Sequence, residues 1–84
     1  QTVFVVEDED LPRFLIREAL EEAGANVIEA ASISKCNEML DQGKKFDLMV
    51  LDINLAGGNG FEILDKILEE RIPAKVIVAS MYFN

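Results

Sequence analysis

One segment near the middle of the chain reads Phe46-Asp47-Leu48-Met49-Val50-Leu51-Asp52-Ile53-Asn54. Its apolar run ends abruptly on the carboxylate of Asp52, and an apolar run of this length between polar residues is typical of a strand buried on both faces. A second apolar run, residues 3–6, ends in the same way on Glu7 and Asp8. Parallel strands end at the carboxyl edge of their sheet, where open α/β folds bind ligands. We therefore expect three carboxylates to meet at this edge.

Short apolar runs alternate with helical patterns along the whole chain. The apolar runs predict strands over residues 2–6, 26–30, 47–51 and 74–79. The intervening patterns predict three helices: one from an N-cap at Asp10 to a stop at Gly24, one from a cap at Ser32 to Gly43, and one over residues 60–71. The first helix is expected to bury an apolar stripe made of Leu11, Phe14, Leu15, Ala19, Leu20 and Ala23. The third is expected to bury Phe61, Leu64, Ile67 and Leu68.

This alternation of strands and helices predicts an α/β fold with a doubly wound parallel sheet. Helices should cover both faces, because three of the four strands are apolar on both sides. A flavodoxin-like strand order, 2-1-3-4, would put the strands at 2–6 and 47–51 side by side at a topological switch point. Glu7, Asp8 and Asp52 would then converge, with Ser80 next to them at the end of the fourth strand.

Composition and charge exclude several classes of function. At 84 residues the chain is one domain at most, and its net charge of −8 argues against a nucleic-acid surface. With no His and one Cys, it has no set of zinc ligands. No apolar run approaches the roughly 20 residues that a membrane-spanning helix needs. The single Cys36 cannot form an internal disulfide, so we expect a reducing, cytoplasmic location and no membrane partner.

Each candidate residue also has a simpler interpretation. The acidic run over residues 7–10 would complement the positive end of the following helix even without a ligand. Asp52 alone would fit the start of a turn, Asn54 would fit an Asx turn, and Ser80 would fit a local hydrogen bond at a strand end. The glycine-rich segment 57–60 favours turn chemistry, because it lacks both the lysine of a P-loop and the spacing of a dinucleotide-binding loop. It is the pairing of the acidic run with Asp52 that favours a metal site.

With these residues in place, the whole chain resembles a response-regulator receiver domain. The acidic pair that follows the family's first strand matches Glu7-Asp8. The phosphoacceptor aspartate at the end of the third strand matches Asp52, and the Ser/Thr at the end of the fourth matches Ser80. The family's Asp-x-x-Leu-Pro-x-x-Asp-Gly pattern appears as residues 52–60.

The chain departs from the family pattern at several positions. Ala56 replaces the usual proline, Asn59 replaces the usual acid, and Met81 stands where the family mostly has a small residue. The resemblance implies that residues 1–84 form the N-terminal two-thirds of a receiver domain, without the last helix, strand and helix. The phosphate-contacting lysine of the family's fifth strand would be missing, and Lys75 lies at the wrong end of its strand to replace it.

The resemblance implies a signalling phosphoacceptor rather than an enzyme. Asp52 would accept a phosphoryl group from a sensor histidine kinase or a phosphotransfer protein. Mg²⁺ would be bound by Glu7, Asp8, Asp52 and the backbone carbonyl of Asn54, and Ser80 would hydrogen-bond the phosphoryl oxygens. Three close carboxylates repel one another, so at least one pKa should rise when no cation is bound.

Two other functions fit parts of the sequence. A phosphatase of the haloacid-dehalogenase type also forms an aspartyl phosphate, but it needs an acid two residues after the nucleophile, where this chain has Asn54. A truncated module that is not phosphorylated and acts through its surface is the other alternative. Since an apolar fourth strand would lack a neighbour, we expect either strand exchange or a homodimer through the open edge of residues 74–79, or a longer parent chain that continues beyond these residues.

Overall fold

The computed structural model describes residues 1–55 and 58–79. It contains strands β1 (Thr2–Val6), β2 (Asn26–Ala30), β3 (Leu48–Asp52) and β4 (Lys75–Ala79). The helices between them are α1 (Asp10–Glu22), α2 (Ile33–Asp41) and α3 (Phe61–Glu69). All strand pairs are parallel and the order is β2-β1-β3-β4, which confirms the predicted flavodoxin-like sheet.

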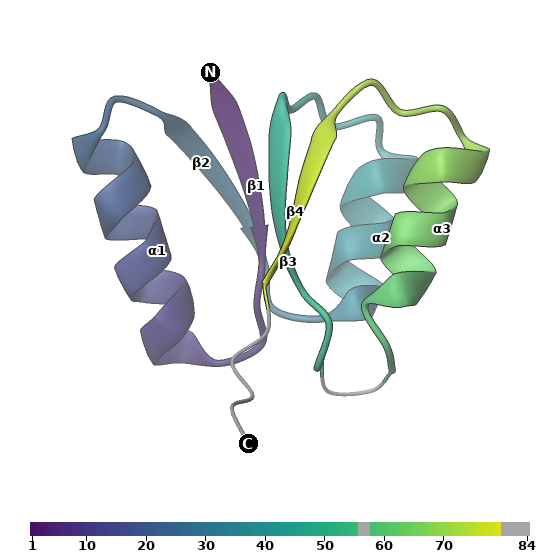
Figure 1. The fold of residues 1–84 in the computed structure, drawn as a ribbon, viewed down its shortest axis with the longest axis horizontal. Coiled ribbons are helices and arrows are strands. Elements are labelled where there is room, and N and C mark those ends of the chain that lie inside the picture. Colours follow the sequence, from purple (N-terminus) through teal and green to yellow (C-terminus); the bar gives the residue numbers. More distant parts are fainter. Residues whose placement is uncertain (56–57, 80–84) are drawn as a thin grey trace.

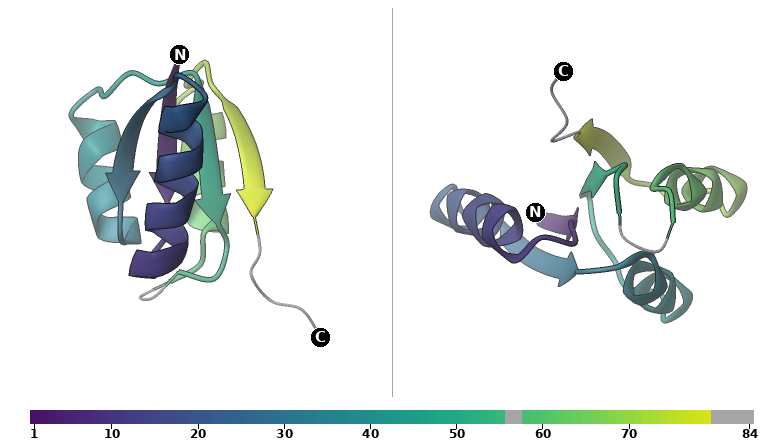
Figure 2. Two further views of the ribbon diagram at one scale, coloured as in Figure 1. Left: turned by 90° about the vertical axis from the view of Figure 1, so that its left-hand side faces the viewer. Right: turned by 90° about the horizontal axis from the view of Figure 1, so that it is seen from below.

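The helices form a layer on each side of the sheet. Figure 1 shows α1 on one face, and α2 and α3 side by side on the other. Viewed from the side in Figure 2, β2 and β4 lie at opposite edges. This arrangement confirms the doubly wound sheet and explains why the central strand β1 is apolar at consecutive positions: Val3 to Val6 are all buried.

The main core lies between the sheet and the pair of helices α2 and α3. Phe4 of β1 packs edge-on against Phe46, with ring centroids 5.2 Å apart. The buried members of the core include Phe4, Val6, Ala30, Cys36, Met39, Leu40, Phe46, Met49, Leu51, Leu55, Ile63 and Ile67. Cys36 is a small core residue of α2, and burial raises the pKa of its thiol to about 12. The core therefore anchors β1 and β3, the two strands that carry the candidate carboxylates.

The predicted helix faces need two corrections. No residue of α1 is buried, and Leu11, Phe14 and Leu15 are exposed. Among the described residues α1 is the only helix on its face of the sheet, so part of its apolar stripe extends beyond the strands that it covers. In α3 the buried residues are Ile63 and Ile67, one turn apart; Phe61 and Leu68, which we expected to be buried, point toward solvent.

The predicted element ends are wrong by one or two residues in places. The N-cap of α1 is Glu9, not Asp10, and Glu9 makes no side-chain capping bond. Asp10 is the first helical residue, and its carboxylate instead accepts a hydrogen bond from Arg13. The expected cap at Ser32 is confirmed, because its Oγ accepts the Lys35 N–H at 3.0 Å. Within residues 1–55 and 58–79, no helix is both long enough and apolar enough to cross a lipid bilayer.

Candidate functional site

The candidate site lies at the carboxyl edge of the sheet, which faces the viewer in the view from below in Figure 2. The register explains its position: Val6 of β1 pairs with Leu51 of β3, so the next residues, Glu7 and Asp52, extend from neighbouring strands. On its other side, the Glu7 N–H donates to the Ala30 carbonyl at the end of β2, over 3.1 Å. Backbone pairing with both neighbours thus fixes where the Glu7 side chain begins.

Three carboxylates come together at this edge. Glu7, Asp8 and Asp52 each offer one oxygen, and these oxygens lie within 4.8 Å of one another. Glu7 is 3% exposed and Asp52 is 5% exposed, while Asp8 is half-buried. Buried charges are costly unless they are paired or bound to a metal, so this cluster needs a physical explanation.

The cost of burying these charges is reflected in the pKa of Glu7. Its pKa is raised from 4.5 to about 7, chiefly because burial disfavours the charged form. The Glu9 N–H donates to the Glu7 carboxylate over 2.9 Å and lowers this pKa, whereas the nearby carboxylates of Asp52 and Asp8 raise it. Without a cation, Glu7 is therefore protonated below about pH 7.

Asp52 is held by the turn that follows β3. Its Oδ1 accepts the backbone N–H of Asn54 at 3.0 Å, an Asx-type bond that fits the turn considered for Asp52. The Gly60 N–H donates to the carbonyl of Ile53 at 2.9 Å, which brings the start of α3 against the turn. A Cβ at Gly60 would lie 2.5 Å from the backbone oxygen of Asp52, so this close approach requires a glycine.

The other predicted residues are distributed as follows. Asn54 is an exposed residue two positions after Asp52, and only its backbone was proposed as a ligand. Ser80 lies outside the described residues, as do Ala56, Gly57 and Met81. Lys75 begins β4 at the amino edge of the sheet, opposite the carboxylates, as expected.

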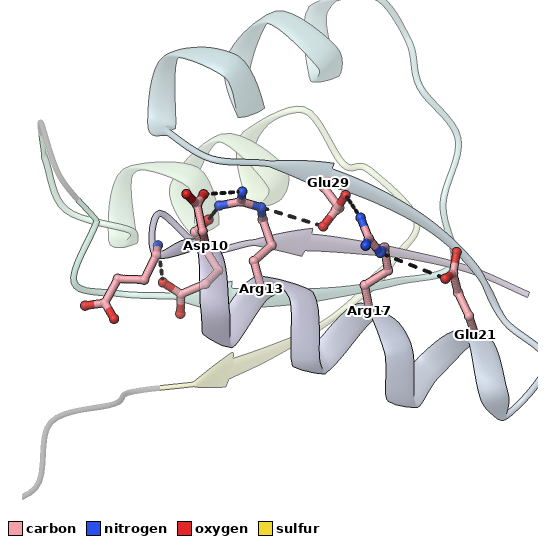
Figure 3. A network of polar contacts seen from close by, with 7 residues as sticks. Asp10, Arg13, Arg17, Glu21 and Glu29 are labelled. Atoms are coloured by element: carbon pink, nitrogen blue, oxygen red, sulfur yellow. Dashed lines mark hydrogen bonds and ion pairs between the residues drawn. The ribbon is translucent and has the colours of Figure 1, made fainter.

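An ion-pair network that we did not predict from the sequence connects α1 to β2 and to the candidate site (Figure 3). Arg13 contacts Asp10 at 2.6 Å and Glu29 at 3.6 Å, and its Nη1 donates to the Glu7 carbonyl at 3.0 Å. Arg17 contacts Glu29 at 3.1 Å and Glu21 at 3.9 Å. The spacing of three residues between Asp10 and Arg13 was the available sequence signal. The contacts with Glu29 depend on the fold.

The donor set fits a small, hard divalent cation. All three clustered side chains offer carboxylate oxygens, which Mg²⁺ prefers, and they lie close enough together to surround one ion. A cation there would offset both the cost of burying the Glu7 charge and the smaller repulsion from Asp52 and Asp8. Glu7, Asp8 and Asp52 are thus the residues that could hold Mg²⁺.

Comparisons with known proteins agree on one family for this chain. The family model for the response regulator receiver domain matches residues 3–84. The sensory transduction protein LytT of Bacillus subtilis is 35% identical over 85 residues, covering 95% of this chain and 34% of that protein. A cyclic di-GMP phosphodiesterase of Thermotoga maritima is 33% identical over 81 residues, covering 96% of this chain and 21% of that protein. The chain therefore spans about a fifth to a third of the length of these relatives.

A solved structure supports the same fold. The response regulator TrrA of Thermotoga maritima, crystallised with Mg²⁺ and a beryllium fluoride, superimposes with a TM-score of 0.89 at 29% sequence identity. The match covers 98% of this chain and 70% of the TrrA chain.

Proposed function

This chain belongs to the response regulator receiver domain family, and from that premise we propose that Asp52 accepts a phosphoryl group from a histidine kinase or a phosphotransfer protein. Phosphorylation of an aspartate is the general property of this family. The observation that carries the proposal is the convergence of Glu7, Asp8 and Asp52 at the carboxyl edge of the sheet. The beryllium fluoride and Mg²⁺ in the TrrA structure support it, since that structure shares this fold.

In the proposed reaction, a carboxylate oxygen of Asp52 attacks the phosphorus of a phosphohistidine on the donor. An O–P bond forms and the P–N bond breaks, and the leaving imidazole nitrogen keeps the bonding electron pair and takes up a proton. The Asn54 N–H holds Oδ1, which makes Oδ2 the proposed nucleophile. Because Asp52 is buried, the fold already limits the directions that its carboxylate can take.

Mg²⁺ is the proposed cofactor, and Glu7, Asp8, Asp52 and the Asn54 carbonyl are its proposed ligands. When bound, it would neutralise charge on the phosphoryl oxygens. Ser80 is proposed to hydrogen-bond those oxygens, on the family resemblance alone. Residues 1–84 are proposed to form the N-terminal part of a receiver domain. The protein is proposed to lie in the cytoplasm and to act as a signalling phosphoacceptor, not as an enzyme.

The test is phosphorylation by a small phosphodonor. We expect phosphoramidate with Mg²⁺ to add one phosphoryl group to the protein, measured by intact mass, and to add none after Asp52→Ala. Asp65→Ala is the matched control, because Asp65 is an exposed carboxylate on α3 away from this edge of the sheet. A wild-type protein that gains no mass and also binds no beryllium fluoride with Mg²⁺ would favour a non-phosphorylated module. An adduct that persists in Asp52→Ala would move the phosphoacceptor elsewhere.

We also propose that the protein forms a homodimer through β4. In the described part of the chain β4 is an edge strand, with Ile77 53% exposed and Val78 46% exposed. An apolar edge strand offers unpaired backbone groups to a second copy. Light scattering should give the mass of a dimer for the wild type and of a monomer for Ile77→Lys. A monomeric wild type would contradict the proposal.

A further inference from the structure

Arg13 connects three separate segments at the base of the candidate site. Its side chain is only 18% exposed, although it lies on a surface helix. Nη1 donates to the Glu7 carbonyl at the end of β1, Nη2 contacts the Asp10 carboxylate at the start of α1, and Nε faces Glu29 of β2. Figure 3 shows the guanidinium between Asp10 and Glu29.

We propose that Arg13 is a positioning residue for the metal site: it holds the Glu7 carbonyl, so that the carboxylates of Glu7 and Asp8 stay directed toward Asp52. This inference rests on the proposed function, because it assumes that the three carboxylates bind Mg²⁺. Arg13 touches neither the cation nor the phosphoryl group in this role.

The local backbone explains why such a residue is needed. Only residues 7–9 join β1 to α1, and the N-cap of α1, Glu9, makes no side-chain capping bond. Every polar group of Glu7 has a different role: its N–H donates to Ala30, its carboxylate accepts from Glu9, and its carbonyl accepts from Arg13. The bond to the Glu7 carbonyl is made by the Arg13 side chain, whose planar guanidinium can serve several acceptors at once. Removing Arg13 would take this partner from the Glu7 carbonyl and loosen the peptide between Glu7 and Asp8.

The charge of Arg13 has an opposite effect on Mg²⁺ affinity. A guanidinium near a cation site repels the cation, so removing Arg13 would by itself tighten Mg²⁺ binding. Asp10 and Glu29 lie against the same guanidinium and offset most of its charge, and solvent screens the exposed part of this network. We therefore expect the loss of positioning to exceed the relief of repulsion.

Arg17 provides a matched control one turn further along α1. It also binds Glu29, and it reaches Glu21 and lies over the Phe14 ring. Its contacts among the described residues do not include the turn at residues 7–9. Replacing Arg17 by methionine thus removes the same charge and comparable ion pairs from the same helix while leaving the Glu7 carbonyl bonded.

The experiment measures the Kd for Mg²⁺ by isothermal titration calorimetry on the whole protein, well above the pKa of Glu7. Loss of groups that orient metal ligands typically weakens metal affinity by about tenfold or more, and we expect a change of about tenfold for Arg13→Met. Arg17→Met should stay within about twofold of the wild type, and Arg13→Lys should lie between them because an ammonium lacks the fork. An unchanged or lower Kd in Arg13→Met, or an equal rise in Arg17→Met, would overturn the proposal.

A second measurement separates this inference from the proposed function. Amide hydrogen exchange of the Glu9 N–H, which donates to the Glu7 carboxylate, is followed without metal. Faster exchange in Arg13→Met than in Arg17→Met supports the positioning role, and equal exchange overturns it. If the wild type binds no Mg²⁺, the proposed function fails while this measurement still tests Arg13. If Arg13→Met does not fold, the same two comparisons are made with Arg13→Lys, which must then differ from Arg17→Lys.

Discussion

Replacing Glu7 by glutamine should make the metal-free protein more stable. Glu7 is buried beside Asp52 and Asp8, and its pKa is raised to about 7. Glutamine has nearly the same shape and keeps an oxygen that can accept the Glu9 N–H, but it carries no charge. Glu7→Gln therefore removes the cost of burying a charge and the smaller repulsion from Asp52 and Asp8, while it retains the local hydrogen bond.

The pKa sets the sign and the size of the effect. Glu7 has a higher pKa in the folded state than its ordinary value of 4.5, so the folded state binds more protons between about pH 4.5 and about pH 7. The stability that protonated Glu7 contributes is fully present below about pH 4.5 and is lost as the pH rises through about 7. At about 1.4 kcal/mol for each pKa unit, the difference amounts to about 3 kcal/mol, or a melting temperature change on the order of 10 °C.

The assay is thermal unfolding of the wild type and Glu7→Gln in EDTA, followed by circular dichroism. At about pH 4 the two melting temperatures should nearly coincide, and at about pH 8 the variant should melt on the order of 10 °C higher. Adding Mg²⁺ at about pH 8 should stabilise the wild type and reduce this difference, because the cation offsets the charge of the deprotonated Glu7. Glu18→Gln, an exposed change of the same charge on α1, is the control.

The reasoning fails if Glu7→Gln is no more stable than the wild type at about pH 8, or if Glu18→Gln gives the same gain. The first result would mean that Glu7 is already neutralised by another group. The second would mean that a lower net charge alone explains the effect, because the chain carries a net charge of −8.

Three further changes test other parts of the structure, each by urea unfolding. Gly60→Ala places a Cβ 2.5 Å from the Asp52 carbonyl oxygen, so it should cost about 2 kcal/mol or more and reduce phosphorylation; unchanged stability would mean that the turn can open freely. Ile67→Ala should cost about 2–5 kcal/mol, whereas the exposed Leu68→Ala should stay within about 0.5 kcal/mol, and the reverse order would return α3 to the face expected from the sequence. Ser32→Ala removes the cap of α2 and should cost about 1 kcal/mol, while no loss would mean that water replaces the cap.

The parts of the fold that the sequence predicts well depend on local patterns. The apolar run ending on Asp52 defines both β3 and its carboxyl end, and the same holds for the run before Glu7. Parallel strands with helical connections admit few topologies, and the flavodoxin-like order 2-1-3-4 is one of the two common doubly wound orders. The meeting of Glu7 and Asp52 then requires only that β1 and β3 are neighbours.

The errors occur where distant parts of the chain decide the outcome. Leu68 fits the apolar stripe of α3 in the sequence, but the helix turns Ile63 and Ile67 toward the core. Asp10 is a good N-cap by residue type, but it binds Arg13 instead. The contact between Arg13 and Glu29 joins a helix to an edge strand. The sequence alone does not predict that these two residues meet.

Protonation and metal binding at Glu7 compete for the same buried carboxylate. Below about pH 7, Glu7 holds a proton, so Mg²⁺ can use this ligand only by displacing it, and the apparent affinity should fall as the pH decreases. Above that pH the charge repels Asp52 and Asp8 and weakens the folded state, until a cation binds and stabilises it in proportion to the logarithm of its concentration. Because the same buried charge, disfavoured by burial and by its two acidic neighbours, both destabilises the fold and binds the cation, Glu7→Gln should raise stability and weaken Mg²⁺ binding together. A variant that gained stability and kept its Mg²⁺ affinity would remove Glu7 from the ligand set.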